Sequence, residues 1–386
     1  MEQAILVGVS SRQEPRSAAA QHLEELRELA LSAGAGVRDS ILQSRERLDP
    51  AYLIGRGKAS EIAERVQREN LDLVIFDETL SPAQQRNLES LLQCKVLDRA
   101  ALILDIFAQR ARTREGKLQV ELAQLNYLLP RLAGSSGALS RLGGGIGTRG
   151  PGETKLEMDR RRIRSRIAHI RSEIEKVRRH RHLHRARRQG IPVPVVTLVG
   201  YTNAGKSTLF TALTRSETLQ SERMFATLDP LVRRIHLHSA GDVLLTDTVG
   251  FVRKLPPDLV AAFRATLEEI GEADLLLHVV DRSEENYREQ IRAVEEILSD
   301  LGFEKVPTLL VFNKIDLIPD FEPGPHRENQ FVAVSALKGT RLQELRSAMD
   351  LQLKAIIQPA KRATRGEAAP WALDISMRGP RSGRIK

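Results

Sequence analysis

The 386-residue chain is long enough for two or three domains, and its composition of 41% apolar and 28% charged residues is ordinary for a globular protein. No apolar run reaches the ~18 residues that a membrane span needs. The start of the chain has no basic segment followed by a long apolar stretch, which argues against a secretory signal. The single cysteine, Cys94, excludes an internal disulfide and suits a reducing compartment. We therefore expect a cytoplasmic protein without a membrane span.

The net charge of +9 is unevenly distributed along the chain. Residues 155–190 contain 14 Lys and Arg against 4 Asp and Glu, a net charge of +10, so the rest of the chain sums to −1. A positive excess confined to one segment indicates a local site for a polyanion. A solvated arginine-rich helix is the alternative.

The first hundred residues alternate between strand and helix patterns. Strands are predicted at 4–9, 40–43 and 73–76, and helices at 17–31, 58–68 and 82–92. This alternation predicts a small α/β domain over residues 1–99.

Two leucine- and isoleucine-rich segments follow. Apolar residues recur at spacings of 4, 3, 4 and 3 over 118–132 and again over 163–177. This repeat keeps one apolar seam on a helix and favours helix pairing. Between the two segments, residues 133–152 contain eight glycines. We predict an antiparallel helical hairpin over 100–190 whose helices are joined by a glycine-rich loop at 133–152, although a plain flexible linker would have the same composition.

Beyond the proline-containing segment 191–194, apolar strands alternate with helices again. Strands are expected at 195–199, 243–246, 275–280, 308–312 and 331–334. The pattern predicts an α/β domain over 191–357 with a mostly parallel sheet covered by helices. The tail, 358–386, has seven basic and two acidic residues and three prolines, which suits an extension without a core of its own.

A glycine-rich motif begins this third region. The segment 200–208 reads GYTNAGKST and matches G-x-x-x-x-G-K-[ST] between a strand and a helix. In such a loop, backbone N–H groups and the helix N-terminus bind phosphate oxygens. Lys206 would neutralise phosphate charge, and the Ser207 hydroxyl would bind Mg²⁺. ATPases, kinases and GTPases share this motif. The expected phosphate-binding residues are Gly200, Asn203, Ala204, Gly205, Lys206, Ser207 and Thr208.

Three further motifs narrow the ligand to a guanine nucleotide. Asp247–Gly250 (DTVG) ends a strand, so Asp247 can hold Mg²⁺ through water and Gly250 can offer its N–H to a γ-phosphate. Asn313-Lys314-Ile315-Asp316 follows another strand, and the Asp316 carboxylate can accept from N1–H and the exocyclic amine of guanine, a donor pair that adenine lacks. Asn313 can bridge loops, the Lys314 stem can cover the base, and the Ala336 N–H after Ser335 can donate to guanine O6. Ligands bind at this edge of doubly wound sheets.

These motifs resemble the G domain of translation-factor-like GTPases, over residues 195–357. The part of the chain before the G domain resembles the HflX family of ribosome-associated GTPases, through the segments 54–58 (IGRGK), 119–130 (QVELAQLNYLLP) and 150–155 (GPGETK), and so does the segment 225–230 (FATLDP) within the G domain. The resemblance implies a hydrolase that converts GTP to GDP and phosphate. It also implies binding to rRNA of the large ribosomal subunit, ribosome-stimulated hydrolysis and separation of stalled or idle subunits. Association with ribosomes, or peripherally with a membrane, is compatible with a cytoplasmic location.

The resemblance also assigns individual residues. Phe225, Ala226 and Thr227 fall in the first switch, where Thr227 would bind Mg²⁺ in the GTP state. Asn203 matches a loop asparagine that helps bind K⁺ near the phosphates in related GTPases. Phe251 stands where many small GTPases carry a water-orienting glutamine, so we name no catalytic residue in this chain and expect slow intrinsic hydrolysis.

The resemblance also places RNA contacts in the front half. The candidates are Arg141 and Arg149 in the loop and Arg160, Arg161 and Arg164 on the following helix. The turn at 54–58 resembles a segment for which ATP binding has been suggested in the family, and a simple turn before a helix explains it equally well. Two other functions stay open: a ribosome-assembly or RNA-binding GTP switch with little turnover, and a different P-loop NTPase acting on nucleic acid.

Overall fold

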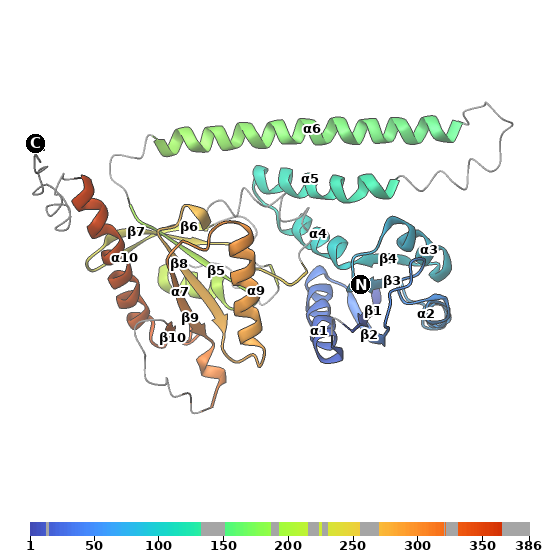
Figure 1. Ribbon diagram of the computed structural model, residues 1–386, viewed down its shortest axis with the longest axis horizontal. Coiled ribbons are helices and arrows are strands. Elements are labelled where there is room, and N and C mark those ends of the chain that lie inside the picture. Colours follow the sequence, from blue (N-terminus) through green and yellow to red (C-terminus); the bar gives the residue numbers. More distant parts are fainter. Residues whose placement is uncertain are drawn as a thin grey trace, which may run out of the picture.

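Two α/β domains lie side by side beneath a pair of long helices (Figure 1). The computed structural model describes residues 1–12, 15–132, 151–186, 193–214, 224–225, 231–254, 270–319, 321 and 331–364. In the helix at 151–186 the structure describes side chains only at 157–177 and 179. In the helix at 342–364 it describes them up to residue 356. Several predicted features lie outside the described residues: Arg141 and Arg149 with nearly all of the glycine-rich loop, Ala226 and Thr227, and the tail from residue 365.

The N-terminal domain is built on a four-stranded sheet in the order β2-β1-β3-β4, and every neighbouring pair is parallel. Strand β1 is buried along almost its whole length, because helices cover both faces of a parallel sheet. Leu23, Leu26 and Leu29 of α1 are buried against one face, as their helical spacing predicts. The elements are β1 (Gln3–Ser10), α1 (Arg16–Ala33), β2 (Gly36–Ser44), α2 (Arg56–Glu69), β3 (Leu73–Phe76), α3 (Pro82–Leu92), β4 (Lys95–Asp98) and α4 (Arg99–Arg110).

Helix α4 and strand β4 were not among the sequence predictions. Strand β4 has only four residues, and eight of the twelve residues of α4 are buried, so the apolar residues of α4 do not follow one stripe. Asp98 begins α4 by accepting a hydrogen bond from the Ala101 N–H, 2.8 Å away. Helix α4 therefore fills the space between the N-terminal sheet and the elements that follow it.

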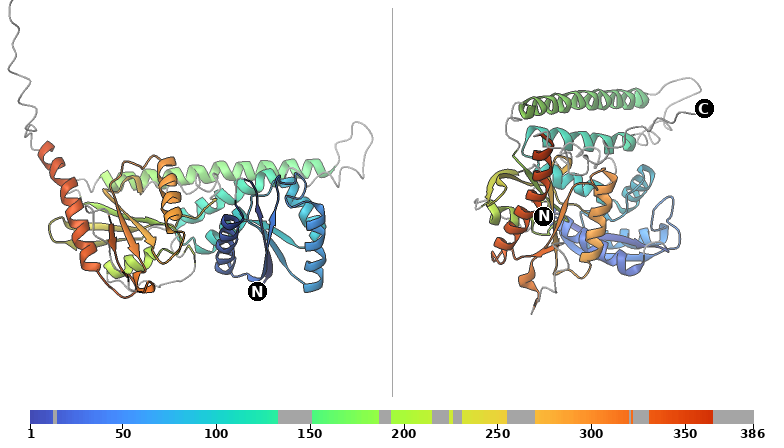
Figure 2. Two further views of the ribbon diagram at one scale, coloured as in Figure 1. Left: turned by 60° about the horizontal axis from the view of Figure 1, so that its bottom comes forward. Right: turned by 60° about the vertical axis from the view of Figure 1, so that its left-hand side comes forward.

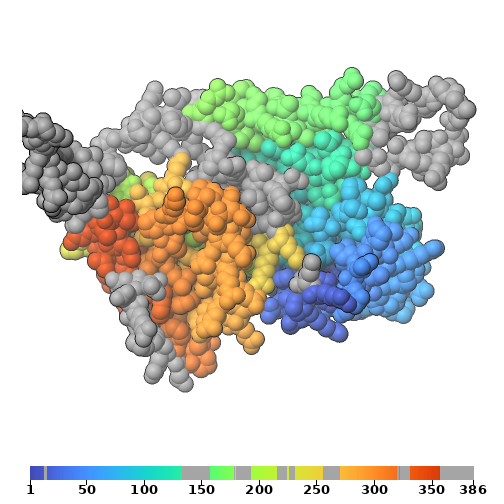
Figure 3. Space-filling model, in the orientation of Figure 1, coloured from blue at the N-terminus to red at the C-terminus, as the bar shows by residue number. Residues whose placement is uncertain are grey.

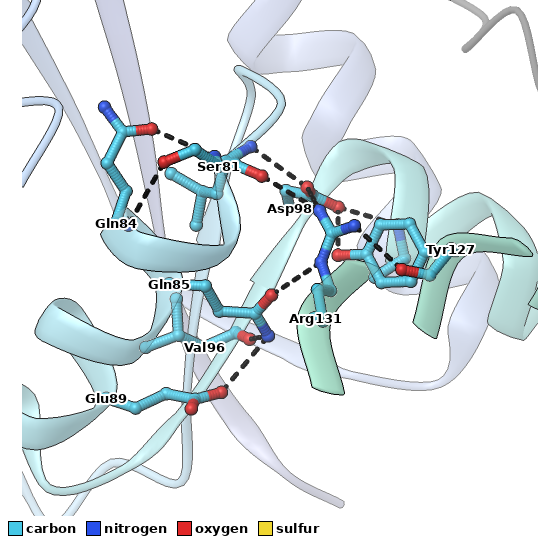
Figure 4. A network of polar contacts seen from close by, with 10 residues as sticks. Ser81, Gln84, Gln85, Glu89, Val96, Asp98, Tyr127 and Arg131 are labelled. Atoms are coloured by element: carbon cyan, nitrogen blue, oxygen red, sulfur yellow. Dashed lines mark hydrogen bonds and ion pairs between the residues drawn. The ribbon is translucent and has the colours of Figure 1, made fainter. Parts of the chain in front are cut away.

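The helix α5 (Arg114–Arg131) is fastened to the N-terminal domain at its end (Figure 4). The buried Asp98 accepts hydrogen bonds from the Tyr127 hydroxyl at 2.9 Å and from Arg131 at 3.1 Å. Arg131 also donates to the carbonyl of Leu80, and its guanidinium stacks 3.4 Å from the centre of the Tyr127 ring. This network fixes the direction in which the helical hairpin leaves the domain.

The hairpin partner of α5 is α6 (Pro151–Ala186), which runs above both domains in Figures 1 and 2. Arg114 pairs with Glu173 and Arg166 with Glu121, so position along α5 rises as position along α6 falls. The two helices are therefore antiparallel, as predicted. Their apolar seam contains Leu118, Leu122, Leu125 and Leu129 on α5 and Ile163, Ile167, Ile170 and Ile174 on α6.

The second domain contains a six-stranded sheet in the order β10-β9-β8-β5-β7-β6. All its neighbouring pairs are parallel except β6 with β7. The edge strand β6 escaped prediction because most of its residues are exposed and two are arginines. The elements of the second domain are β5 (Val195–Gly200), α7 (Lys206–Thr214), β6 (Leu231–Leu237), β7 (Gly241–Asp247), β8 (Leu275–Asp281), α9 (Tyr287–Asp300), β9 (Thr308–Asn313), the 3₁₀ turn η3 (Ile315–Leu317), β10 (Phe331–Ala333) and α10 (Leu342–Thr364).

Helices cover both faces of this sheet. Helices α7 and α10 pack on one face through residues such as Leu209 and Met349, and α9 packs on the other through Val294 and Leu298. The motifs predicted to bind nucleotide follow the carboxyl ends of β5, β7 and β9, which meet at one edge. None of the helices in the described part of the chain combines the length and hydropathy that crossing a bilayer requires.

Candidate functional site

The glycine-rich loop between β5 and α7 requires glycine at two positions. Gly200 has φ +146°, and a Cβ there would lie 2.2 Å from the carbonyl oxygen of Val279. Gly205 has φ +87°, and a Cβ there would lie 2.2 Å from the amide nitrogen of Asn313. Asn203 also adopts positive φ, at +62°. The backbone thus turns tightly ahead of the α7 N-terminus, the geometry that suits binding of phosphate oxygens.

Lys206, the first residue of α7, is buried, and its ammonium donates to the carbonyls of Gly200 at 3.0 Å and Tyr201 at 2.7 Å. Burial lowers the pKa of this group to about 8, and the nearby Asp247 carboxylate opposes the shift only in part. A phosphate beside Lys206 would supply the negative charge that this buried cation lacks.

Ser207 and Asp247 bring two oxygen ligands together. The Ser207 hydroxyl donates a 2.7 Å hydrogen bond to the carboxylate of Asp247, which is fully buried at the end of β7. A hydroxyl and a carboxylate at this distance suit Mg²⁺, which prefers hard oxygen ligands together with phosphate and water. The donor set therefore fits the predicted magnesium site. Thr208 is half-buried in the first turn of α7, directly after these ligands.

Gly250 lies directly against the glycine-rich loop. A Cβ on Gly250 would meet Thr202 at 2.8 Å and the Lys206 ammonium at 3.0 Å. The next residue, Phe251, is 1% exposed. Its ring packs in the apolar core and has no group that can orient water by a hydrogen bond.

Asn313 connects the two loops that were predicted to hold phosphate and base. Its amide nitrogen donates to the carbonyl of Ala204 at 2.9 Å, and its amide oxygen accepts from the N–H of Ala336 at 3.0 Å. The N–H that we expected to reach guanine O6 is thus bonded to Asn313 here, and its contact with a base stays a prediction. Ser335 is fully buried and accepts from the N–H of Lys338.

Lys314 and Asp316 follow directly. Lys314 has φ +60° and pairs with Asp281 at 2.6 Å. This contact fixes its aliphatic stem beside the loop, where it could cover a base. Asp316 is partly exposed in η3, which leaves its carboxylate accessible to a ligand.

Of the predicted first switch the structure describes only Phe225, together with the preceding residue, Met224. Phe225 is 3% exposed, has φ +55°, and packs edge-on against Phe107 of α4 with 4.6 Å between ring centres. The Met224 N–H donates to the hydroxyl of Ser32 in α1. Both neighbours belong to the N-terminal domain, a connection that the sequence pattern did not indicate.

A cavity of about 350 Å³ lies between the N-terminal domain and the loop that joins β5 to α7. Its lining includes Thr202 and Asn203 of the loop, Met224, and the glutamates 24, 25 and 28 of α1. Asn203 is exposed there. The structure thus leaves its amide oxygen accessible, as the expected K⁺ contact requires, and K⁺ binding stays a prediction.

The second phosphate candidate, at 54–58, forms the start of α2. Gly55 precedes the helix with φ +81°, and a Cβ there would lie 2.1 Å from the guanidinium of Arg45. Arg45 donates to the carbonyl of Ile54, and Lys58 pairs with Glu61. These contacts account for the residues as a turn before a helix, and ATP binding there stays a prediction.

The predicted RNA-contact residues that are described lie on α6. Arg161 and Arg164 are exposed, and Arg160 is partly exposed. Arg161 shares the exposed surface of α6 with Arg162, Ser165 and His169. Arg166, on the same helix, donates two hydrogen bonds to the carboxylate of Glu121 in α5.

The fold and the site together define a P-loop GTPase, and comparison with known proteins agrees. The family described as "50S ribosome-binding GTPase" matches residues 195–314, "GTP-binding GTPase N-terminal" matches 20–108, and "GTP-binding GTPase Middle Region" matches 110–188. The chain is 51% identical over 352 residues to the GTPase HflX of Caldanaerobacter subterraneus subsp. tengcongensis, covering 91% of this chain and 81% of that protein. It is 47% identical over 389 residues to the GTPase HflX of Escherichia coli K12, covering 100% of this chain and 87% of that protein.

The chain belongs to the HflX family of GTPases. Among solved structures, a complex of SsGBP with GDP resembles it with a TM-score of 0.50 and 26% identity, covering 92% of this chain and 100% of that one. The predicted family and fold class are thus confirmed, as is GTP hydrolysis as the activity.

Proposed function

We propose that this GTPase binds the large ribosomal subunit through its N-terminal domain and helical hairpin, and that it separates the subunits of stalled or idle ribosomes. The observation that carries the proposal is the direct contact of the N-terminal domain with residues on both sides of the nucleotide site. Ser32 and Phe107 hold the segment at 224–225, and Asp77 holds Lys254, four residues after Gly250. A change at the γ-phosphate can therefore reach the RNA-binding half without a long relay.

The geometry of the loop supports phosphate binding by Lys206 and the backbone at 203–208. In this proposal Ser207 holds Mg²⁺ directly and Asp247 holds it through water, Thr227 joins them as the family resemblance implies, and Asp316 selects guanine. Gly250 senses the γ-phosphate. K⁺ beside Asn203 would add positive charge near the phosphates, a contribution of the kind that phosphoryl transfer requires.

Stimulation of hydrolysis by the ribosome is inferred from the residue that follows Gly250. Phosphoryl transfer depends on positioning and charge stabilisation, and a group supplied by a partner can be worth ~10³–10⁵ in rate. Since Phe251 is buried and apolar, the residue after Gly250 cannot orient the attacking water. We therefore infer that hydrolysis accelerates when the ribosome supplies or orders a polar group.

The RNA-facing surface is assigned to α6. Arg160, Arg161 and Arg164 belong to α6, which runs above both domains in Figure 1 and along the upper edge of the molecule in Figure 3. Contacts between such arginines and rRNA phosphates carry little sequence information, so affinity and not base specificity is their role. Arg141 and Arg149, in the segment 133–152 that joins the two hairpin helices, are proposed as further contacts with rRNA. A protein that acts in this way works in the cytoplasm on ribosomes.

Sucrose-gradient sedimentation tests the proposal. Intact ribosomes are incubated with the protein and GTP or a non-hydrolysable analogue, and GTP hydrolysis is measured in parallel with and without ribosomes. We expect the ribosome peak to fall, free subunits to rise, and the protein to sediment with the large subunit. Binding to the large subunit with intact ribosomes unchanged and no acceleration of hydrolysis would favour the alternative, an assembly or RNA-binding switch.

A further inference from the structure

The segment after Gly250 pairs directly with the glycine-rich loop. The Thr202 N–H donates to the carbonyl of Phe251 at 2.8 Å, and the Phe251 N–H donates to the carbonyl of Gly200 at 3.1 Å. These bonds form a short parallel bridge between Tyr201 and Phe251. In this conformation Phe251 is bridged to the loop, and the chain turns directly afterwards, at 253–254.

The Tyr201 side chain extends this pairing to the N-terminal domain. Its hydroxyl accepts a 2.8 Å hydrogen bond from the backbone N–H of Arg253 and donates a 2.7 Å hydrogen bond to the carboxylate of Glu25 in α1. Tyr201 is 6% exposed, and burial followed by the charge of Glu25 raises the pKa of its hydroxyl. The hydroxyl thus stays protonated, and one oxygen atom joins three segments of the chain.

The chain of contacts continues behind Glu25 and returns to the same segment. Glu25 lies 2.9 Å from the guanidinium of Arg99, which is 1% exposed and also donates to Asp77 at 2.7 Å. The second oxygen of Asp77 accepts from the ammonium of Lys254 at 2.8 Å. Although burial acts to lower them, the pKa values of Arg99 and Lys254 are raised by these carboxylates, so both groups stay charged.

We propose that Tyr201 is a positioning residue that couples the γ-phosphate-sensing segment to the N-terminal domain. This inference rests on the proposed role of Gly250 in sensing the γ-phosphate. A Cβ on Gly250 would lie 2.9 Å from the Cα of Thr202 and 3.0 Å from the Lys206 ammonium, so the two segments are closely packed. In this proposal a γ-phosphate that contacts both Lys206 and Gly250 moves Gly250 away from Lys206. Moving Gly250 displaces Phe251 and Arg253, and the Arg253 N–H then leaves the Tyr201 hydroxyl. Because the same hydroxyl donates to Glu25, the loss of this bond changes the contact between the nucleotide site and α1.

The Tyr201→Phe substitution in the full-length chain tests this coupling, because it removes one oxygen and keeps the ring. Affinities for GDP and for a non-hydrolysable GTP analogue are measured by calorimetry, and exchange of the Arg253 amide is measured by hydrogen–deuterium exchange. We expect GDP affinity to stay within about twofold, since the phosphate-binding backbone is unchanged. Affinity for the GTP analogue should rise about fivefold, the effect of removing one hydrogen bond that holds the segment down. The Arg253 amide should exchange faster.

Tyr127→Phe is the matched control. Its hydroxyl also donates to a carboxylate, that of the buried Asp98, but this pair lies within the N-terminal half. It should leave the GTP-to-GDP affinity ratio unchanged. Glu25→Gln provides a second test, because its effect on the ratio should be absent when Tyr201 is already Phe.

The outcomes are separable. The coupling is refuted if Tyr201→Phe leaves both the affinity ratio and Arg253 exchange as in the unsubstituted chain, or if the Glu25→Gln and Tyr201→Phe effects simply add. If the unsubstituted chain binds GTP and GDP but its Arg253 amide exchanges equally with either, the γ-phosphate-sensing role of Gly250 is wrong instead.

Discussion

The hydroxyl of Ser207 and the carboxylate of Asp247 lie 2.7 Å apart, joined by a hydrogen bond across the edge of the sheet. They come from different elements, the first turn of α7 and the last residue of β7. Strand order places them together, because β5 and β7 are parallel neighbours with the same carboxyl edge. The two groups proposed to hold Mg²⁺, Ser207 directly and Asp247 through water, thus lie side by side.

Replacing Ser207 with Ala should make nucleotide binding nearly insensitive to Mg²⁺. We expect GDP affinity in the presence of Mg²⁺ to fall by at least about tenfold, since losses of this size follow even from removing groups that only support a metal ligand. Affinity in EDTA should change little. Fluorescent-nucleotide titrations with and without Mg²⁺ measure both. Thr214→Ala, which removes another hydroxyl from α7, is the control. An equal loss with and without Mg²⁺ would assign Ser207 a structural role.

Asp316→Asn should exchange guanine for xanthine specificity. The amide nitrogen of Asn donates a hydrogen bond where xanthine carries an acceptor oxygen. Guanine carries an amino group at that position, so two donors would face each other. A site built to hydrogen-bond a group discriminates strongly, so GTP affinity should fall at least about a hundredfold while xanthosine triphosphate gains. Competition binding with both nucleotides measures the switch, and Asp300→Asn on α9 is the charge-matched control. Unchanged preference for GTP would remove Asp316 from base recognition.

Phosphate binding should be coupled to proton uptake at Lys206. Burial lowers the pKa of this group to about 8, so a growing fraction is neutral as pH rises above that value. A bound phosphate favours the charged form, so GDP binding at pH 9 should take up a proton, and affinity should fall as pH rises from about 8 toward the ordinary lysine value. Calorimetry in two buffers of different ionisation enthalpy measures the uptake. Zero uptake at pH 9 would show that Lys206 is charged without ligand.

His278 should make the second domain sensitive to acid. This residue of β8 is 2% exposed, and burial, with the charge of Lys206, lowers its pKa to about 4. The folded state therefore holds the neutral ring while the unfolded chain protonates near pH 6.5. The contribution of His278 to the free energy of unfolding is fully present above about pH 6.5. It is lost as the pH falls toward 4, a loss of up to about 3 kcal/mol. Urea unfolding at pH 7 and 4.5 measures the slope. His278→Leu should flatten it, whereas substitution of the exposed His236 should not; equal slopes in both variants would contradict the assignment.

The arginines of α6 should set the salt dependence of ribosome binding. Replacing Arg160, Arg161 and Arg164 together with Gln should lower the slope of log affinity against log salt by about 0.7 to 0.9 for each rRNA phosphate that is no longer neutralised. Large-subunit affinity measured at several KCl concentrations gives the slope. Arg68→Gln with Arg86→Gln, on α2 and α3, removes exposed charge from a different surface and is the control. An unaltered slope in the α6 variant would make these arginines part of a solvated face.

Much of the architecture was accessible from local pattern. The alternation of apolar strands with helices predicted both α/β domains, and the seam of Leu122, Ile167 and Ile170 predicted the antiparallel hairpin. The missed elements lack such a pattern. Strand β6 exposes arginines at successive positions, and most of the residues of α4 are buried, so its apolar residues form no single stripe.

The sequence by itself determined the chemistry of the nucleotide site. Its motifs are contiguous, and each follows a strand, so parallel pairing alone brings Lys206, Asp247 and Asn313 to one edge. Only the tertiary structure decided which residues of the N-terminal domain contact the loops of that site. Tyr201 meets Glu25, and Phe225 meets Phe107, across more than a hundred residues of chain. Periodicity reports on neighbours within a helix or strand, whereas a contact between domains depends on how two complete surfaces fit, and no local pattern encodes that fit.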